Sequence, residues 1–298
     1  MTVDALNDPF AAPCCDAQAR EECAVVIAHC GGLREAARHC LEERRLDHKT
    51  TLTVLAHQSW KRGALRLEDR RRDVDEPLPG LPEALRLTSP TRVPRRSTGP
   101  AGLVAFVHAI AHIEWNAINL AWDAVWRFDA MPRDYYDDWA RVAAEEAQHF
   151  AMLRGRLREL GAEYGDLPAH AGLWQTAEAT RDDLLDRMAL VPRVLEARGL
   201  DVTPGIVTKL RRQGDERTAR ILDVVLRDEI GHVRIGSQWF HELCRRRGLE
   251  PAGAFAAAIR RHFRGRPQPV RGEEARRLRL EAGFLEEELL ALSELALR

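Results

Sequence analysis

The stretch AAEEAQHF, residues 143–150, places acids and a histidine within a run of helix-forming residues. Glu146 and His149 are three positions apart, so on a helix they project from the same side, about one turn apart. That side also carries Val142 and Phe150, so the pattern predicts that both polar groups face the core. Because an unpaired buried carboxylate costs on the order of several kcal/mol, something must compensate for the charge of Glu146.

The same arrangement recurs in LRDEIGHV, residues 226–233. Glu229 and His232 again lie three apart, between apolar residues of one helix face, and an acid again precedes the glutamate, as Asp228 here and Glu145 in the first stretch. A single E-x-x-H is weak evidence because the chain has 11 histidines. Two such pairs, each predicted to be buried and each on its own helix, predict a shared site.

Apolar residues recur with helical spacing in four long segments, at about 102–128, 134–160, 174–198 and 215–247. Gly161 and Gly248 are expected to end the second and fourth helices. The sequence GLDVTPG, residues 199–205, is expected to close the third. Pro192 falls inside the third pattern, where it should kink the helix or loosen its hydrogen bonding.

The first and third helices are expected to supply one carboxylate each. A di-metal carboxylate centre in a four-helix bundle takes one Glu from each of two helices and Glu-x-x-His from each of the others. Glu114 is the acid that lies in the apolar stripe of the first helix. Glu196 lies in line with Met188 and Ala189 on the third, and it fits better than the acids at 182–186.

The spacing of the four glutamates indicates an internal repeat. Glu114 and Glu146 are 32 positions apart, and Glu196 and Glu229 are 33 apart. Each half of this region therefore reads as a helical hairpin that carries Glu and then Glu-x-x-His, which is typical of a pseudo-twofold repeat.

These features resemble the ferritin-like superfamily of di-iron carboxylate proteins. The phrases HAIAHIEWNAINLAWD, YYDDWARVAAEEAQHF, YGDLPAHAGLW, MALVPRVLEARGLDVTPG and RDEIGHVRIGSQWF resemble the bacterial family catalogued as domain of unknown function 455, over about residues 94–263. The resemblance implies that the metal ligands are Glu114, Glu146, His149, Glu196, Glu229 and His232. It implies a fold and a metal site, without an established reaction.

Simpler interpretations exist for each of these residues. The six candidate ligands could form surface ion pairs, a buried polar network without metal, or a degenerate site. His108 and His112 are interpreted as packing residues or supports of ligands rather than direct ligands. Glu145 and Asp228 could steady the two histidines, or they could be solvated surface acids.

The aromatic residues are interpreted mainly as packing. A protective role in hole transfer is the alternative for the six tryptophans of the helical region, which are Trp115, Trp122, Trp126, Trp139, Trp174 and Trp239. The tyrosines, Tyr135, Tyr136 and Tyr164, fall at helix starts or in loops, which does not support a tyrosyl radical.

Composition agrees with an all-α chain. The 298 residues are 45% apolar and 31% charged, with 20 Gly and three Tyr, a balance that favours helices. We expect a ferritin-like four-helix bundle with extra N-terminal and C-terminal helices. The expected division is an N-terminal helical segment (1–65), a Pro/Arg-rich connector (66–100), the bundle with its di-metal site (101–250) and a C-terminal helical extension (251–298).

The flanking segments have simple local patterns. Residues 18–46 predict one or two short helices, with a break at Gly31 and Gly32. Residues 66–100 contain prolines and arginines without periodicity, which is typical of an extended connector that wraps the surface or is partly disordered. Short helices are expected at 251–264 and 272–293.

Charge and cysteine content limit the functional classes. The formal charge is −1 although all but three of the 45 basic residues are arginines, so wholesale nucleic-acid binding is not indicated. The stretch 260–280 has eight arginines; a solvated or ion-paired surface is favoured there over contact with RNA or an anionic substrate. No C-x-x-C pair occurs among Cys14, Cys15, Cys23, Cys30, Cys40 and Cys244.

The expected location is a reducing cytoplasm. Neither a signal peptide nor a transmembrane stretch is predicted. The cysteines at 23, 30 and 40 are interpreted as free thiols that pack as small core residues.

The predicted function follows from the donor set. Imidazole and carboxylate ligands suit Fe(II), Mn(II) or a mixed pair, with iron first. We expect an O2-dependent oxidase or hydroxylase of an organic substrate, with an unidentified electron donor and a homodimer left open. The alternatives are a ferroxidase that handles iron without an organic substrate and a hydroxylase that modifies tRNA.

Overall fold

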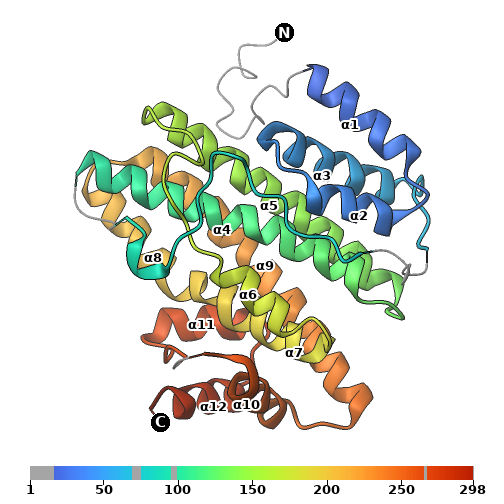
Figure 1. The fold of residues 1–298 in the computed structure, drawn as a ribbon. Coiled ribbons are helices and arrows are strands. Elements are labelled where there is room, and N and C mark those ends of the chain that lie inside the picture. The colour runs from blue at the N-terminus through green and yellow to red at the C-terminus, as the bar shows by residue number, and fades with distance from the viewer. Residues whose placement is uncertain (1–16, 69–74, 95–98, 265–266, 298) are drawn as a thin grey trace. The chain divides into compact units, whose positions relative to one another are not determined.

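The computed structural model describes residues 17–68, 75–94, 99–264 and 267–297, and its secondary structure is almost entirely helical (Figure 1). Within these ranges no strand forms; one isolated bridge joins Leu87 and Ala169. The all-α prediction is confirmed. The chain divides into two compact units, Met1–Ala171 and Gly172–Arg298, which are called unit 1 and unit 2 below.

Three helices begin unit 1: α1 (Ala17–His29), α2 (Leu33–Glu42) and α3 (Leu46–Lys61). The predicted break at Gly31 and Gly32 is confirmed, since neither residue is helical. Cys23 and Cys40 are buried free thiols, as expected, whereas Cys30 is only partly buried. Cys14 and Cys15 lie outside the described residues.

The centre of unit 1 is the hairpin of α4 (Pro100–Arg127) and α5 (Arg133–Glu159), with α2 packed on α4 and α3 packed on α5 (Figure 1). Pro100 begins α4 at a position where its missing N–H costs nothing. Gly161, with a φ of 79°, follows the end of α5. Both helices begin and end within two residues of the predicted bounds.

Arg34 of α2 closes the carboxyl end of α4. Its guanidinium is buried and donates to the carbonyl oxygens of Val125 (2.9 Å), Trp126 (2.8 Å) and Phe128 (3.0 Å). These carbonyls have no partner inside the helix, and a cation is favourable at this end of the helix dipole. The contact fixes where α4 ends and the turn into α5 begins.

Among the residues that the structure describes, one helix is long and apolar enough to be considered a membrane span. It is α4, but 61% of its apolar window is buried inside the protein. This burial is typical of a core helix, and we interpret α4 in that way.

The connector is extended and is held to unit 1 by backbone hydrogen bonds. Its described part, 75–94, contains a single short 3-10 turn, η2 (Pro90–Arg92). Gly80 donates its N–H to Leu41 O (2.8 Å), and its carbonyl accepts from Trp115 Nε1 (3.0 Å). A Cβ at Gly80 would lie 2.1 Å from Glu43 O, so only glycine fits. The extended part of the prediction is confirmed, and residues 69–74 and 95–98 lie outside the described residues.

Unit 2 contains the second hairpin. Its first arm consists of α6 (Gly172–Ala179), α7 (Leu184–Leu190), the π-helical turn η3 (Val191–Glu196) and α8 (Ala197–Arg212). Its second arm is α9 (Glu216–Arg247), which packs on α8 and ends at Gly248 with a φ of 65°, as predicted.

The prediction of one helix over 174–198, closed by 199–205, was wrong at both ends. Residues 180–183 interrupt it, and Asp183 caps α7 by accepting from Leu185 N at 2.7 Å. At the other end α8 continues through Pro204 to Arg212. Its buried residues Leu200, Val207 and Leu210 lie on one face, so the gain from burying that face outweighs the local cost of the proline.

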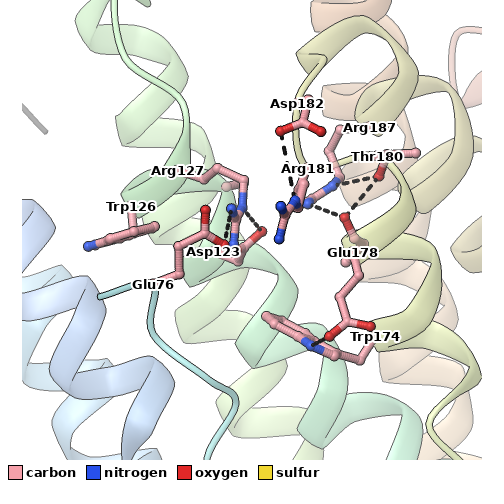
Figure 2. Close-up of polar contacts among 12 residues, drawn as sticks. Glu76, Asp123, Trp126, Arg127, Trp174, Glu178, Thr180, Arg181, Asp182 and Arg187 are labelled. Atoms are coloured by element: carbon pink, nitrogen blue, oxygen red, sulfur yellow. Dashed lines mark hydrogen bonds and ion pairs between the residues drawn. The ribbon is translucent and has the colours of Figure 1, made fainter. Parts of the chain in front are cut away.

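The corner between α6 and α7 is held by polar contacts that Figure 2 shows. The buried Arg187 donates to Thr180 Oγ1 (2.9 Å) and to the carbonyl oxygen of Ala177 (2.6 Å). Trp174 donates to Glu178 at 3.0 Å within α6. The Arg187 guanidinium thereby ties α7 to the last turn of α6.

The C-terminal extension comprises α10 (Pro251–His262), α11 (Glu273–Glu281) and α12 (Glu286–Leu297). The helix predicted at 251–264 is confirmed. The one predicted at 272–293 is two helices, separated at Gly283, whose φ of 82° favours glycine. Asp186 of α7 accepts from Arg261 (2.6 Å) and His262 (2.7 Å) and so ties α10 to the first arm of unit 2.

Candidate metal centre

Three of the predicted ligands meet in the core of unit 1. Glu114 comes from α4, and Glu146 and His149 come from α5, with exposed fractions of 2%, 0% and 1%. His149 Nδ1 lies 3.2 Å from Glu146 Oε2 and 3.5 Å from Glu114 Oε2. The predicted burial of the E-x-x-H pair and its meeting with Glu114 are therefore present in the structure.

When both of its carboxylates are ionised, the charge of this group is not balanced by its own members. Two carboxylates surround one imidazole, which even when protonated offsets only one of them. Burial, together with the nearby charge of Glu146, raises the pKa of Glu114 to about 8. Glu114 Oε2 is buried, and it accepts no hydrogen bond from the described residues. A cation of higher charge would remove this deficit.

The donor atoms are spaced as metal ligands are. One ligand atom from each of the three side chains lies within 4.8 Å of the others. Ligands about 2.0–2.2 Å from one ion stand about 3–4 Å apart in tetrahedral or octahedral sites. Small side-chain movements would therefore bring all three donors onto one ion, and oxygen and imidazole donors both suit a divalent transition metal.

Unit 2 carries the second E-x-x-H pair in a looser arrangement. Glu229 Oε2 and His232 Nδ1 lie 3.8 Å apart on α9, and their exposed fractions are 7% and 1%. Glu196 is buried at the end of the π-helical turn η3. Among the described residues of unit 2, these three do not form a triad as compact as that of unit 1.

His108 and His112 have partners of their own. His108 Nε2 accepts from Gly165 N at 3.0 Å. His112 lies 2.8 Å from the Tyr164 hydroxyl and 3.0 Å from the His170 carbonyl oxygen, and burial lowers its pKa to about 4. Both rings are thus neutral packing residues that hold the 161–171 loop, in line with the favoured interpretation.

Glu145 and Asp228 both lie beside arginines. Glu145 is 3.8 Å from Arg141, and Asp228 accepts from Arg227 at 2.9 Å. Their carboxylates keep exposed fractions of 31% and 22%. These contacts favour surface acids over supports of the two histidines.

The aromatic residues near the triad form a packed wall. Phe150, next to His149, lies 5.0 Å from the ring of Trp115 and 5.1 Å from that of Tyr164. All three are buried. The packing role is confirmed for these residues, whereas hole transfer stays a prediction.

Four of the eight arginines in the 260–280 stretch form ion pairs within unit 2. Arg261 pairs with Asp186, and Arg279 makes a two-pronged contact with Asp201 at 2.8 and 2.7 Å. The pairs Arg276–Glu286 and Arg277–Glu281 lie on the surface. The ion-paired interpretation is favoured over an RNA contact, and Arg266 lies outside the described residues.

Buried cations are the features that the sequence pattern did not predict. Lys49 is fully buried, donates to Leu41 O (2.9 Å) and Glu43 O (3.2 Å), and has its pKa lowered to about 7 by burial. Arg193 is fully buried one residue after Pro192. The available signal for Lys49 was its rarity, since the chain uses arginine almost everywhere else.

Comparison with known proteins shows the family of this chain. The model of a family described as a protein of unknown function (DUF455) matches residues 42–290. The chain belongs to the DUF455 family. An uncharacterized protein of Haemophilus influenzae strain Rd is 44% identical to this DUF455 chain over 238 residues, which are 76% of the chain and 80% of the relative. No solved structure matches this chain.

Proposed function

We propose that this DUF455 protein is a di-metal carboxylate protein with a ferritin-like four-helix bundle. The bundle helices would be α4, α5, the first arm of unit 2 (α7, η3 and α8) and α9. The observation that carries the proposal is the buried group of Glu114, Glu146 and His149, whose donor atoms lie within 4.8 Å of one another with an excess of negative charge. A group of this kind is costly without a cation.

The second half of the centre would come from unit 2. Glu196, Glu229 and His232 are all buried, and they repeat the residue types and order of the first half. Four carboxylates neutralise two divalent ions, so the complete set would carry no net charge when loaded. That neutrality would explain why a helical core accepts four glutamates.

Each side chain has a proposed role. His149 and His232 would each anchor one ion, Glu146 and Glu229 would bridge the two ions, and Glu114 and Glu196 would be terminal ligands able to change their mode of binding. The aromatic wall of Trp115, Phe150 and Tyr164 would keep bulk water away from the first half.

Iron is the metal that we propose first, with manganese or a mixed pair as alternatives. Bound iron would supply O2-dependent two-electron oxidation, and we propose an organic substrate that is oxidised or hydroxylated. Such a reaction would need an electron donor. A cytoplasmic location and a homodimer stay proposals, as does the absence of a membrane or nucleic-acid partner.

Metal analysis tests the proposal. Metal-free protein titrated with Fe(II) or Mn(II) without oxygen should bind two ions per chain, and addition of O2 to the iron form should give the Mössbauer signature of two coupled ferric ions. Binding of one ion or none would contradict the di-metal proposal. Turnover of many Fe(II) per chain would favour the ferroxidase alternative over oxidation of an organic substrate.

A further inference from the structure

The π-helical turn η3 is the least regular part of the proposed metal centre. Pro192 has no N–H to donate, and its ring would clash with the carbonyl of the residue four before it in a regular α-helix. The helix widens here, and Ala197 N–H bonds to Pro192 O, five residues back. Turns of this kind are rare in proteins, and those that occur often lie at functional sites. Glu196 is the last residue of this turn, so its placement depends on what holds the turn.

The first restraint is a close contact with α9. A Cβ built on Gly236 would lie 2.4 Å from both Cβ and Cγ of Pro192, so the proline ring occupies the space that any other residue at 236 would need. The two arms of unit 2 form an antiparallel hairpin that turns at Gly214. Four residues after Pro192 comes Glu196, and four residues before Gly236 comes His232. The contact therefore brings Glu196 to about the same level as His232.

The second restraint is the side chain of Arg193. Its guanidinium has no exposed surface and donates to Glu288 of α12 at 2.5 Å and to Ser237 of α9 at 3.2 Å. The charged carbon stands 4.3 Å from the ring of Phe240, 4.6 Å from Phe255 and 4.4 Å from Phe284. Cation–π contact replaces hydrogen bonding for Nη1, which finds no acceptor among the described residues.

Glu288 is itself held in place. It is fully buried and accepts from His241 Nε2 (2.9 Å) and from the backbone N–H of Leu285 (2.8 Å). Arg193 thus joins the π-helical turn to α9, α10 and α12 through one rigid group. A buried ion pair of this kind is retained at a high desolvation cost, which indicates a specific role beyond stability.

We propose that Arg193 and Glu288 are positioning residues that fix the height and direction of Glu196, so that the C-terminal extension forms part of the metal centre. The inference rests on the proposed di-metal function. It assigns α10 and α12 a task in metal binding although neither supplies a ligand. Breaking the Arg193–Glu288 ion pair should lower the affinity for the ion that unit 2 holds and should leave the ion of unit 1 bound.

The variant Glu288→Gln tests this proposal in the full chain. We expect two-step Mn(II) binding in which the weaker step loses about 10- to 100-fold in affinity, the range usual for residues that support metal ligands. Hydrogen exchange of metal-free protein should quicken in residues 191–200. The matched control is Asp186→Asn, which breaks a partly buried ion pair between the first arm and α10 and should leave both affinities unchanged.

A second variant covers a failure of Glu288→Gln to fold. Gly236→Ala buries no unpaired charge but displaces Pro192. It should lower the affinity for the ion of unit 2 by at least tenfold. If wild-type protein binds two ions and each variant that folds binds them with unchanged affinity, the positioning role is wrong while the proposed function survives. If wild-type protein binds no ion, the proposed function itself fails.

Discussion

The two halves of the proposed centre carry the same residues in different settings. In unit 1 the lone carboxylate, Glu114, sits in the middle of the unbroken 28-residue helix α4, and His149 lies 3.2 Å from Glu146. In unit 2 the corresponding Glu196 ends a π-helical turn, and the His232–Glu229 separation is 3.8 Å. A regular helix needs no outside support to place its ligand, whereas an irregular one does.

This difference would make the two proposed metal sites unequal. The first half has its donors assembled before metal arrives, so it should bind the first ion more tightly. The second half depends on Gly236, Arg193 and Glu288 for its geometry, so it should bind later and respond more to distant changes.

The largest effect should come from Glu146→Ala. Glu146 is fully buried in the triad and is the proposed bridge, so its loss should abolish binding of both ions, a decrease in affinity of at least 100-fold. Plasma emission analysis of protein loaded without oxygen measures this. Glu145→Ala, which changes a half-exposed acid beside Arg141, should keep both ions; equal loss in the two variants would contradict the assignment.

The next effect distinguishes the two histidines. His232→Ala should remove one ion and leave one bound at nearly wild-type affinity, because the triad of unit 1 is complete without it. His149→Ala should weaken both steps, since it disrupts the half that binds first. Titration calorimetry with Mn(II) measures both binding steps. Identical affinities in the two variants would contradict the proposed difference between the two halves.

A smaller effect concerns pH. The Glu114 carboxyl ionises near pH 4.5 in the unfolded chain and near pH 8 in the folded metal-free protein, so between these values the folded state binds more protons. The free energy of unfolding should therefore fall as pH rises over this window, by at most about 1.4 kcal/mol per pH unit from this group. Urea unfolding of metal-free protein from pH 5 to 8.5 measures the slope.

Glu114→Gln is the control for the pH experiment. The amide does not titrate, so the variant should show a flatter dependence over the same window. An unchanged slope would mean that the Glu114 carboxyl does not titrate within this window, and the raised pKa assigned to it would be wrong.

The smallest effect is expected for Pro192→Ala. Alanine restores an N–H and allows the turn to become regular, which should shift Glu196 slightly. The affinity for the second ion should then fall by less than tenfold. The first ion should not change. A loss as large as that of His232→Ala, measured by the same titration, would mean that the π-helical turn itself defines the second site.

The sequence pattern predicted the long helices and the burial of Glu114, Glu146 and His149 well, for a physical reason. In α4, α5 and α9 one apolar stripe runs without interruption, so periodicity alone fixes which side chains are buried. Glu114, Glu146 and His149 were found because they are polar exceptions within such stripes. The predicted bounds of these helices lie within two residues of the observed ones.

The pattern failed where burial overruled local signals. Pro204 is a strong helix breaker, yet α8 passes through it because Leu200 and Val207 bury their side chains on the inner face. Lys49 and Arg193 were missed because a cation in a sequence is read as solvent-exposed, and only the folded chain shows the carbonyls, rings and carboxylate that enclose them.

The most direct test of the central claim is a crystal structure of iron-loaded protein with anomalous diffraction measured at the iron edge. The account predicts two anomalous peaks per chain, one bound by Glu114, Glu146 and His149 and the other by Glu196, Glu229 and His232, with the two central glutamates bridging them. A single peak, or none beside Glu146, would contradict it.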